Sequence, residues 1–555
     1  MSAVVESPPA KVLRERNADP LTLGVVTLAV LVAAPIIALV WLAFAPGSGS
    51  SSSLSHLFGT VMPRYTLVTA HLALVVVGVV SVVGVSTGWL IAAYDFPGRT
   101  ALAWLLVLPL STPAFVMAYA YTDFLSTWGP LQTGLRRLTG LEVGQYWFPD
   151  IYSANGAGVF LGLALYPYVY LLSRAAFADR SPSLAEAARS LGSSRHMVWW
   201  RVTWPVARPA VAAGTALALM ETLADFGTVS YFAVDSFTAG IYRAWQGLGD
   251  RVGAAQLALM LLVFVGALMW IERGSRSRMQ FHARSARPAP RVRLSGWRAW
   301  RATLWCCLPP LAGFLLPALL LLYSWAGDGM QVDGRLAGWV FNTALLAGAG
   351  AVVVLPLALL AAYAARLGDG RLLQVGIGLA NSGYAMPGVV LGVGLLILSG
   401  LIDRALAPLT GLLGVPALLA GGSVFAVVYA YAVRFFSVGW QAIDSALKRI
   451  SPSMDQSARS LGRRPVEVLS EVHWPLMRRG LAVAALLVFI DCLKELPATL
   501  VLRPFDFDTL AVIAFQFASD ERLSAAALPS LLIVVISLLP VIFLSRVAST
   551  EHGRR

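Results

Sequence analysis

Residues 181–205 read SPSLAEAARSLGSSRHMVWWRVTWP, a polar and basic stretch between two long apolar runs. A second stretch, 451–475, reads SPSMDQSARSLGRRPVEVLSEVHWP and aligns with the first without a gap, so that position 181 matches position 451 and the offset stays constant. Twelve of the twenty-five aligned positions are identical. A match of this kind at a fixed period indicates an internal repeat, so the chain is expected to consist of two related halves.

Both copies carry the signals of a helical hairpin at the membrane surface. A serine followed three residues later by Glu or Gln is a capping box that opens a helix, and the pairs are Ser183 with Glu186 and Ser453 with Gln456. A glycine about two turns later ends that helix in the left-handed conformation, and these glycines are Gly192 and Gly462. A second short helix is expected to stop at the Trp-Pro pairs 204–205 and 474–475. A plainer interpretation is that the hairpins only cap the helices beside them.

The composition is that of a polytopic membrane protein. Of the 555 residues 57% are apolar and 13% are charged, and the mean hydropathy is +0.71. Several apolar runs are long enough to cross the roughly 30 Å hydrocarbon core of a bilayer. They lie near 21–45, 66–93, 101–125, 156–178, 207–230 and 253–271, and near 302–325, 338–364, 372–399, 416–440, 479–502 and 525–545. The first run exceeds the apolar core of a signal peptide and is expected to be a retained span.

The runs divide six and six around residues 273–301, an Arg-rich stretch without apolar period that is predicted to be a cytoplasmic surface linker. This division predicts a first half at 1–272 and a second half at 302–555. An even number of spans per half makes the halves parallel repeats. The predicted fold class is an all-α integral membrane protein of about twelve transmembrane helices in two parallel six-helix repeats.

The basic residues are distributed unequally between the two sides of this topology. With alternate loops on alternate sides, 30 of the 42 Lys and Arg residues share the side of the repeated loops, and 9 lie opposite. The positive-inside rule then places both termini and both repeated loops in the cytoplasm. Membrane topology therefore accounts for the net charge of +13, and this charge does not indicate a nucleic-acid partner.

The first loop resembles the EAA loop of ABC-importer permeases, in its Glu-Ala-Ala followed by a glycine four residues later and by Pro205. The resemblance implies a type I permease fold, in which this loop is a coupling helix that docks on a separate ATP-binding subunit. The coupling residues that it implies are Glu186, Ala187, Ala188 and Gly192. Their counterparts in the second loop are Gln456, Ser457, Ala458 and Gly462, so the docking helix is expected there without the acidic contact.

Carboxylates also recur at the same offset in the next apolar run, as Glu221 and Asp225 in the first half and Asp491 and Glu495 in the second. Counted from residue 208, Glu221 lies about 20 Å into the run at about 1.5 Å per residue. A spacing of four places the two acids of each half on one helix face. Ionisable groups at this depth are costly and normally face a water-filled path or a partner.

Two interpretations of these acids remain open. They line a translocation path, or they lock helices together by pairing with Lys494 and Arg434; for Lys494 itself, pairing is the expected role. Gly227 and Pro497 are expected to break each helix just beyond its acids, and broken backbone at this depth is tolerated where it is buried or lines a cavity. We therefore prefer the path for the acids.

The stretches ALMETLADFGTVSYFAVDSFTAGIYRAWQGLGDRVGAAQLA, from residue 218, and DCLKELPATLVLRPFDFDTLAV, from residue 491, resemble the fused two-half permeases of ferric-iron ABC importers. The resemblance covers most of the chain. It implies a bacterial inner-membrane permease, a periplasmic substrate-binding protein as partner, and a homodimer of ATP-binding subunits on the cytoplasmic side. Ferric iron is a hard cation that prefers oxygen ligands such as these carboxylates, although carboxylates also suit polyamines or a thiamine cation.

The sequence contains no recognisable catalytic or cofactor motif. None of its lysines completes a phosphate-binding P-loop, its six histidines are scattered, and its three cysteines form no CxxC pair. An enzyme, a bound cofactor and a fixed metal site are therefore not expected, and ATP hydrolysis is expected in the partner subunit. A rival hypothesis is a self-powered secondary transporter that uses the four carboxylates as a proton relay. That hypothesis gives no reason for two matched cytoplasmic hairpins.

Overall fold

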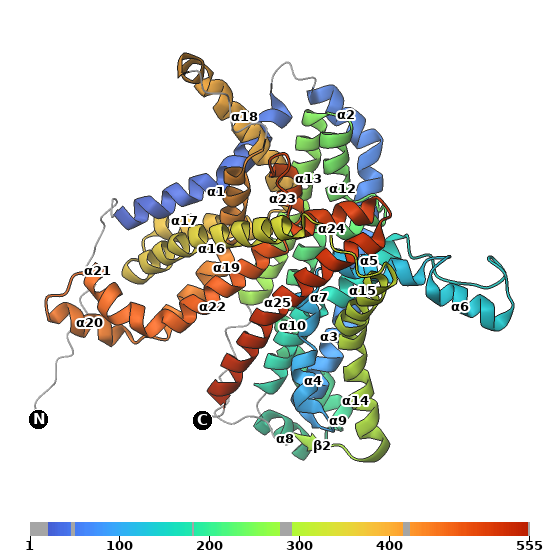
Figure 1. Cartoon of the computed structure of the whole chain (residues 1–555). Coiled ribbons are helices and arrows are strands. Elements are labelled where there is room, and N and C mark those ends of the chain that lie inside the picture. The colour runs from blue at the N-terminus through green and yellow to red at the C-terminus, as the bar shows by residue number, and fades with distance from the viewer. Residues whose placement is uncertain (1–19, 46–49, 180–181, 278–290, 414–421, 553–555) are drawn as a thin grey trace, which may run out of the picture.

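The computed structural model describes residues 20–45, 50–179, 182–277, 291–413 and 422–552, and all statements below refer to these residues. Nearly all of them are helical (Figure 1). The strands among them are two residues long: β1 (Tyr94–Asp95) pairs in parallel with β2 (Val292–Arg293). The predicted all-α class is confirmed.

The first half begins with α1 (Pro20–Phe44), α2 (Ser50–Gly59), α3 (Val61–Ala93), α4 (Arg99–Leu105), the 3₁₀ turn η1 (Leu108–Ser111), α5 (Ala114–Leu125), α6 (Pro130–Thr139) and α7 (Ala154–Ala178). It continues with α8 (Pro182–Ser190), α9 (Arg195–Val198), the π turn η2 (Trp199–Thr203), α10 (Trp204–Ala224), α11 (Gly227–Tyr231), α12 (Phe237–Tyr242), the π turn η3 (Arg243–Gly247) and α13 (Arg251–Ser277).

The second half begins with α14 (Gly296–Pro310), the π turn η5 (Leu311–Leu315), α15 (Leu316–Gly327), α16 (Leu336–Leu367), α17 (Arg371–Asn381), the 3₁₀ turn η6 (Ser382–Ala385), α18 (Gly388–Leu413) and α19 (Val424–Lys448). It continues with α20 (Pro452–Ser460), α21 (Pro465–Val468), the π turn η7 (Leu469–His473), α22 (Trp474–Leu493), α23 (Pro497–Leu502), α24 (Leu510–Ser519) and α25 (Leu523–His552).

Matching stretches of sequence form matching elements. The pairs α7 and α19, α8 and α20, and α9 and α21 begin and end at positions that the sequence repeat aligns, and α10 and α22 begin at aligned positions. The residues that cap α7 and α19 also correspond, because the hydroxyls of Ser153 and Ser423 each accept a hydrogen bond from the backbone N–H three residues later. The repeat therefore extends from sequence to local structure.

Several of the predicted apolar runs are not single straight helices. Eight described helices are long and apolar enough to cross a membrane, and a further candidate is a pair bent by 92° between η1 and α5. The runs predicted near 207–230 and 479–502 are each broken, after α10 and after α22. The run near 372–399 is divided by η6, and the run near 416–440 begins outside the described residues. The number of twelve spans therefore stays a prediction.

The two halves exchange their first long helices. Helix α1 packs against α16, α17 and α18 of the second half, while α15 packs against α5 and α14 packs against α3 of the first. Tyr429 donates a hydrogen bond to the carbonyl of Leu31 at 2.6 Å, and Tyr121 donates one to the carbonyl of Ala312 at 2.5 Å. Each half therefore covers its apolar surface with a helix from the other, and neither predicted half is a separate packing unit.

The stretch 273–301 is structured at both ends. Helix α13 extends to Ser277, and β2 and the start of α14 occupy the other end, while residues 278–290 lie outside the described part. The backbone N–H of Leu294 donates to the carbonyl of Asp95 at 2.9 Å, which fastens the end of this stretch to the chain just after α3. The two ends of this stretch therefore belong to the folded body, whereas the sequence predicts a surface linker over the whole of it.

The exchanged helices approach closely where glycine removes the side chain. A Cβ on Gly394 of α18 would lie 2.8 Å from the carbonyl oxygen of Pro35 in α1, whereas a Cβ on Gly400 of the same helix would meet nothing within 4 Å. We expect Gly394→Ala to lower stability by roughly 1–3 kcal/mol through overpacking. Gly400→Ala should be neutral or slightly stabilising, because alanine favours helix.

Thermal denaturation of the purified chain, followed by the loss of its monodisperse chromatographic peak, measures this difference. Equal melting temperatures for the two variants would contradict the close packing of α1 on α18.

Candidate functional site

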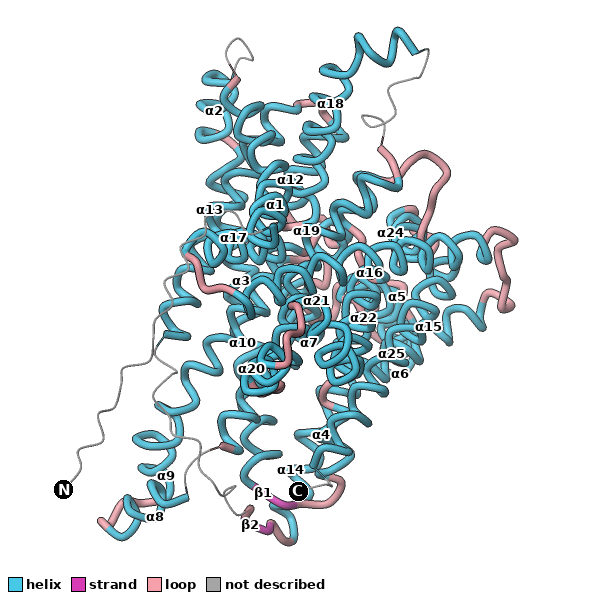
Figure 2. Tube along the Cα trace, turned by 90° about the vertical axis from the view of Figure 1, so that its left-hand side faces the viewer, coloured by secondary structure: helices cyan, strands magenta, loops and turns pink. Residues whose placement is uncertain are grey.

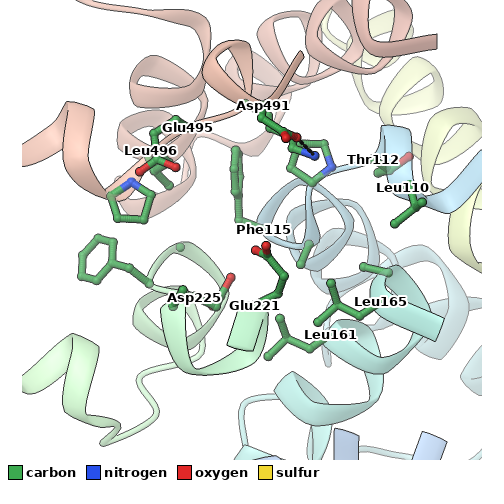
Figure 3. Close-up of a pocket in the computed structure, with 18 of the residues that line it drawn as sticks. Leu110, Thr112, Phe115, Leu161, Leu165, Glu221, Asp225, Asp491, Glu495 and Leu496 are labelled. Atoms are coloured by element: carbon green, nitrogen blue, oxygen red, sulfur yellow. Dashed lines mark ion pairs between the residues drawn. The ribbon is translucent and has the colours of Figure 1, made fainter. Parts of the chain in front are cut away.

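All four predicted path residues line one cavity. The cavity, about 130 Å³, lies where the broken helix α10–α11 of the first half meets the broken helix α22–α23 of the second. Figure 3 shows Glu221 and Asp225 on one side and Asp491 and Glu495 on the other. Carboxylates at matching positions of the sequence repeat therefore face one space between the halves.

The second acid of each pair lies in the helix break itself. Helix α10 ends at Ala224, and Asp225 accepts hydrogen bonds from the backbone N–H groups of Thr228 and Val229, both at 3.1 Å. Helix α22 ends at Leu493, and Glu495 accepts one from the N–H of Ala498 at 3.0 Å. These carboxylates satisfy the first free N–H groups of the following helices.

Two predictions about this region are therefore wrong. The breaks do not lie beyond the acids but begin at residues 225 and 494, ahead of Gly227 and Pro497. Because Asp225 and Glu495 lie outside α10 and α22, the two acids of each half do not share one helix face. The carboxylates prefer to cap the next helix, and the chain leaves helical geometry to allow it.

The two acids of the second half are paired with cations. Glu495 and Arg434 form an ion pair at 3.1 Å, and their side chains are only 5% and 10% exposed. Asp491 and Lys494 form a second ion pair at 2.9 Å, with about a quarter of each side chain exposed. For these two acids the structure therefore contains the locking contacts that formed the alternative interpretation.

The two acids of the first half have other partners. The positions that match Arg434 and Lys494 are Ala164 and Ala224, which line the same cavity and carry no charge. Among the described residues no ion pair to Glu221 or Asp225 is present. Glu221 instead accepts a hydrogen bond from the hydroxyl of Tyr384 at 2.6 Å, which joins the two halves across the cavity. Glu221 is thus the cavity carboxylate that neither pairs with a cation nor caps a helix.

Tyr384 and Tyr168 also contribute polar groups to the cavity lining, and neither is among the predicted path residues. Tyr384 lies in η6, at the polar interruption Asn381-Ser382-Gly383 of an otherwise apolar run. That interruption is a signal that could have indicated it. Within the described residues no three His, Cys, Asp or Glu side chains stand close enough to hold a metal ion. The cavity therefore offers separate carboxylate and phenol oxygens rather than a preformed metal site.

The two predicted coupling hairpins lie at the ends of helix pairs that diverge from the centre. In Figure 1, α8 and α9 are at the bottom of the molecule and α20 and α21 at the left. Figure 2 shows α8 and α9 at the end opposite to α2 and α18. Most of the predicted coupling residues are exposed, namely Glu186, Ala187, Gly192, Gln456, Ser457 and Gly462, while Ala188 is half-buried and Ala458 is buried.

The glycine prediction for these hairpins is confirmed. Gly192 and Gly462 have φ values of +85° and +80°, the left-handed conformation that ends a helix. The serine prediction is wrong in the second hairpin, because the residue that caps α20 is Ser451 and its hydroxyl accepts from the N–H of Ser453 at 3.3 Å. The side chain of Ser183, on which the first capping box depends, lies outside the described residues.

The Trp-Pro pairs do not stop the second helix of either hairpin. That helix passes through a π turn, η2 or η7, directly into the long helix α10 or α22. In both, the N–H of the tryptophan bonds to the carbonyl five residues earlier, from Trp204 to Trp199 and from Trp474 to Leu469. A wider turn gives room for the proline that follows, which lacks an N–H and clashes with a carbonyl in a regular helix.

Comparison with known proteins identifies the class of this chain. The family described as "Binding-protein-dependent transport system inner membrane component" matches residues 84–280. The Fe(3+)-transport system permease protein FbpB 2 of Haemophilus influenzae is 24% identical over 484 residues, which cover 85% of this chain and 88% of that protein. This chain is an ABC-importer permease. It is a membrane-embedded transport subunit and not an enzyme.

Other relatives of the permease differ in length. The ferric transport system permease protein FbpB of Actinobacillus pleuropneumoniae is 23% identical over 79% of this chain and 64% of its own length. The molybdenum transport system permease protein ModB of Escherichia coli is 28% identical over 207 residues, 86% of that protein but 35% of this permease. A relative that aligns almost completely with so short a segment accords with two related halves in one chain.

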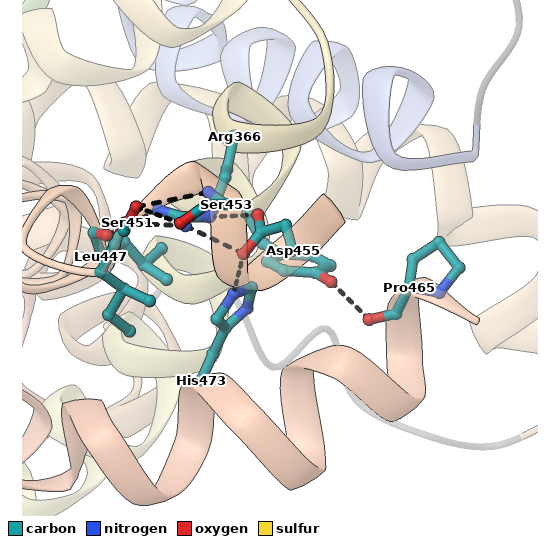
Figure 4. Close-up of polar contacts among 9 residues, drawn as sticks. Arg366, Leu447, Ser451, Ser453, Asp455, Pro465 and His473 are labelled. Atoms are coloured by element: carbon teal, nitrogen blue, oxygen red, sulfur yellow. Dashed lines mark hydrogen bonds and ion pairs between the residues drawn. The ribbon is translucent and has the colours of Figure 1, made fainter. Parts of the chain in front are cut away.

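A buried polar network holds the second of the two predicted coupling hairpins (Figure 4). Asp455 accepts hydrogen bonds from the Arg366 guanidinium at 2.8 and 3.0 Å and lies 2.8 Å from the ring of His473, which is fully buried. Arg366 also donates to the carbonyls of Leu447 and Ile450. Burial disfavours the ionised carboxyl, but the hydrogen bonds from Arg366 and His473 outweigh it and lower the pKa of Asp455.

The first hairpin is held differently. The residues that match Asp455 and His473 are Ala185 and Thr203, so the same network cannot form there. Aromatic rings take its place: Trp89 of α3 packs edge-on against Phe177 and Trp199, at ring-centroid distances of 5.1 and 6.3 Å. In the second hairpin the carboxylate of Asp455 is thus bound by Arg366 and His473, whereas in the first hairpin Glu186 is exposed.

We expect Asp455→Ala to loosen the second hairpin, because it leaves Arg366 without its carboxylate, at a cost of about 3–5 kcal/mol for a mostly buried pair. Limited trypsin digestion should then cut faster at Arg459 or Arg463. The matched control is Glu471→Ala, which removes an exposed partner of Arg463 and should change the digestion rate little.

Because the pKa of Asp455 is lowered in the fold, its contribution is present above the ordinary carboxyl pKa and is lost as pH falls through its folded pKa. The difference in digestion between wild type and Asp455→Ala should therefore persist from pH 6 to pH 8. A difference that disappears within this range would contradict the network.

Proposed function

We propose that this permease imports ferric iron by alternating access between its two halves. The observation that carries the proposal is the combination of a ferric-permease relative aligned over 85% of the chain with a carboxylate-lined cavity between the halves. A substrate-binding protein on the periplasmic side would deliver the iron. ATP-binding subunits, as a homodimer beneath the coupling hairpins, would supply the energy.

The chemistry of the cavity supports a hard cation as substrate. Four carboxylates and two tyrosines line it against two cationic side chains, so acids are in excess. Carboxylate and phenol oxygens are the ligand types that a hard ferric ion prefers. Since Asp491 and Glu495 are paired and Asp225 caps α11, Glu221 is the residue that we assign to the first contact with the substrate.

The hydrogen bond from Tyr384 gives Glu221 a place in the transport cycle. It joins the first half to the second, so the halves cannot separate at the cavity without breaking it. A cation bound to Glu221 withdraws electron density from the carboxylate that accepts this hydrogen bond. We therefore infer that arrival of the substrate weakens one of the contacts that keep the halves closed.

The proposed topology places the hairpins, both termini and the stretch 273–301 in the cytoplasm, with a first half at 1–272 and a second at 302–555. The excess of Lys and Arg on that side supports it. The coupling residues would be Glu186, Ala187, Ala188 and Gly192 in one hairpin and Gln456, Ser457, Ala458 and Gly462 in the other. Transport of a polyamine or thiamine, or a secondary transporter, would use the same acids, but neither explains the ferric relatives.

Uptake of radiolabelled ferric iron by cells with and without this chain tests the proposal. Deletion should abolish the ATP-dependent component, and restoring the chain should recover it, while putrescine uptake stays unchanged. Loss of putrescine uptake with normal iron uptake would replace the proposed substrate with a polyamine.

Variants in the restored chain test the assignment of Glu221. Glu221→Gln should slow iron uptake at normal expression and thermal stability, because it removes a charge without stranding a buried cation. Glu495→Gln is the contrasting variant, since it leaves Arg434 buried and unpaired at a cost of about 3–5 kcal/mol. Equal destabilisation by both substitutions would make Glu221 a structural residue.

The two coupling hairpins should contribute unequally. Glu186→Ala should reduce co-purification of the ATP-binding subunit and iron uptake more than Gln456→Ala does, because only the first hairpin presents a carboxylate at this position. The double variant Gly192→Val with Gly462→Val should abolish the association, since valine does not tolerate the left-handed backbone. Equal effects of the two alanine variants at equal thermal stability would reduce Glu186 to a helix-capping residue.

A further inference from the structure

Three arginines gather where the chain leaves α3 and enters α4. Arg99 opens α4, and its side chain, 15% exposed, donates to the carbonyl of Ile91 at 3.0 Å. Arg174 of α7 approaches the same helix and donates to the carbonyl of Ala103, one turn after Arg99, at 3.3 Å. Arg291 directly precedes β2, whose Val292 pairs with Tyr94. Arg174 and Arg291 lie close enough to act electrostatically on Arg99.

We call Arg99, Arg174 and Arg291 the arginine corner. Few acidic side chains lie near it. Asp95 is the acid within ion-pair distance of Arg99, at 3.5 Å, and its own side chain is 61% exposed. This contact with Asp95 is made by the buried Nε of Arg99, and its geometry does not meet that of a hydrogen bond. Arg291 takes part in no hydrogen bond or ion pair within the part of the chain that the structure describes, and its side chain is exposed. A group with several acceptor oxygens would therefore complete the corner.

The neighbouring surface is apolar and aromatic. Helix α14 starts beside the corner, where Thr303 donates to the carbonyl of Pro97 at 2.9 Å. Trp297, Trp300 and Leu304, three and four residues apart, are 73%, 63% and 62% exposed on one face of α14. Exposed tryptophans at the end of a membrane helix are typical of the head-group region of a bilayer. Figure 2 places β1, β2 and the start of α14 at the same end of the molecule as α8 and α9.

We propose that the arginine corner binds the phosphodiester of an anionic phospholipid, with the acyl chains along the exposed face of α14. Guanidinium groups suit phosphate oxygens, and basic pockets between transmembrane helices are the usual sites for anionic head groups. The apolar face beside the corner favours a lipid over free phosphate. The proposal goes beyond the transported substrate and uses the proposed orientation only to name the leaflet, which is the cytoplasmic one.

Titration of the purified, delipidated permease with phosphatidylglycerol, phosphatidylcholine or inorganic phosphate tests the site, with bound lipid counted by native mass spectrometry. Phosphatidylglycerol should bind, and phosphatidylcholine should not compete with it, because phosphatidylcholine carries a choline cation that the three arginines repel. Arg291→Gln should weaken phosphatidylglycerol binding about fivefold, equivalent to about 1 kcal/mol per basic residue at an anionic surface. Arg291→Glu should weaken it further.

The matched control is the double variant Arg298→Gln with Arg301→Gln, which removes two exposed charges from α14 outside the corner. It should change the affinity less than twofold. An equal loss in the control would mean that the surface attracts lipid only through diffuse charge, and displacement of the lipid by millimolar phosphate would make the corner a free-phosphate site. Either result, or equal binding of the two lipids, would overturn the proposal. Because Arg291 is exposed, its variants should fold normally, and iron uptake reports separately on the transport function.

Discussion

A helix that breaks inside a bilayer must find new partners for the backbone groups it frees, since no lipid group can replace them. In this permease the partners are two carboxylates, Asp225 and Glu495, which lie in the breaks and accept hydrogen bonds from the helices that follow. The breaks in turn bring four acids to one cavity between the halves. The polar centre of the molecule therefore depends on an elementary requirement of backbone hydrogen bonding.

The two halves have diverged in how they use equivalent positions. At the cavity the second half places Arg434 and Lys494 where the first half has alanines, so its acids are held in ion pairs. At the predicted coupling hairpins the second half places Asp455 in a buried network with Arg366 and His473, where aromatic packing holds the first hairpin. In both places charge in the second half stabilises the fold, and the first half keeps the more available carboxylate.

The exchanged helices α1, α14 and α15 join the two halves, and we call these three helices the frame. Each exchanged segment packs on the other half, and glycines such as Gly394 let the backbones approach. The hairpins lie at the outer ends of diverging helices (Figure 1). A frame shared by both halves, with the hairpins at the ends of diverging helices, is the arrangement on which the proposed alternating access would act.

The sequence by itself determined the repeat, the helical class, the left-handed glycines at 192 and 462, and the four recurring acids, because these follow from local patterns and a fixed offset. It did not determine which acids are paired, since Glu221 and Tyr384 are 163 residues apart and Arg434 and Glu495 are 61. It also did not place the helix breaks, the π turns before the prolines, or the exchanged helices. Those features are decided by contacts between distant segments, where satisfying a buried charge or N–H outweighs local helical preference.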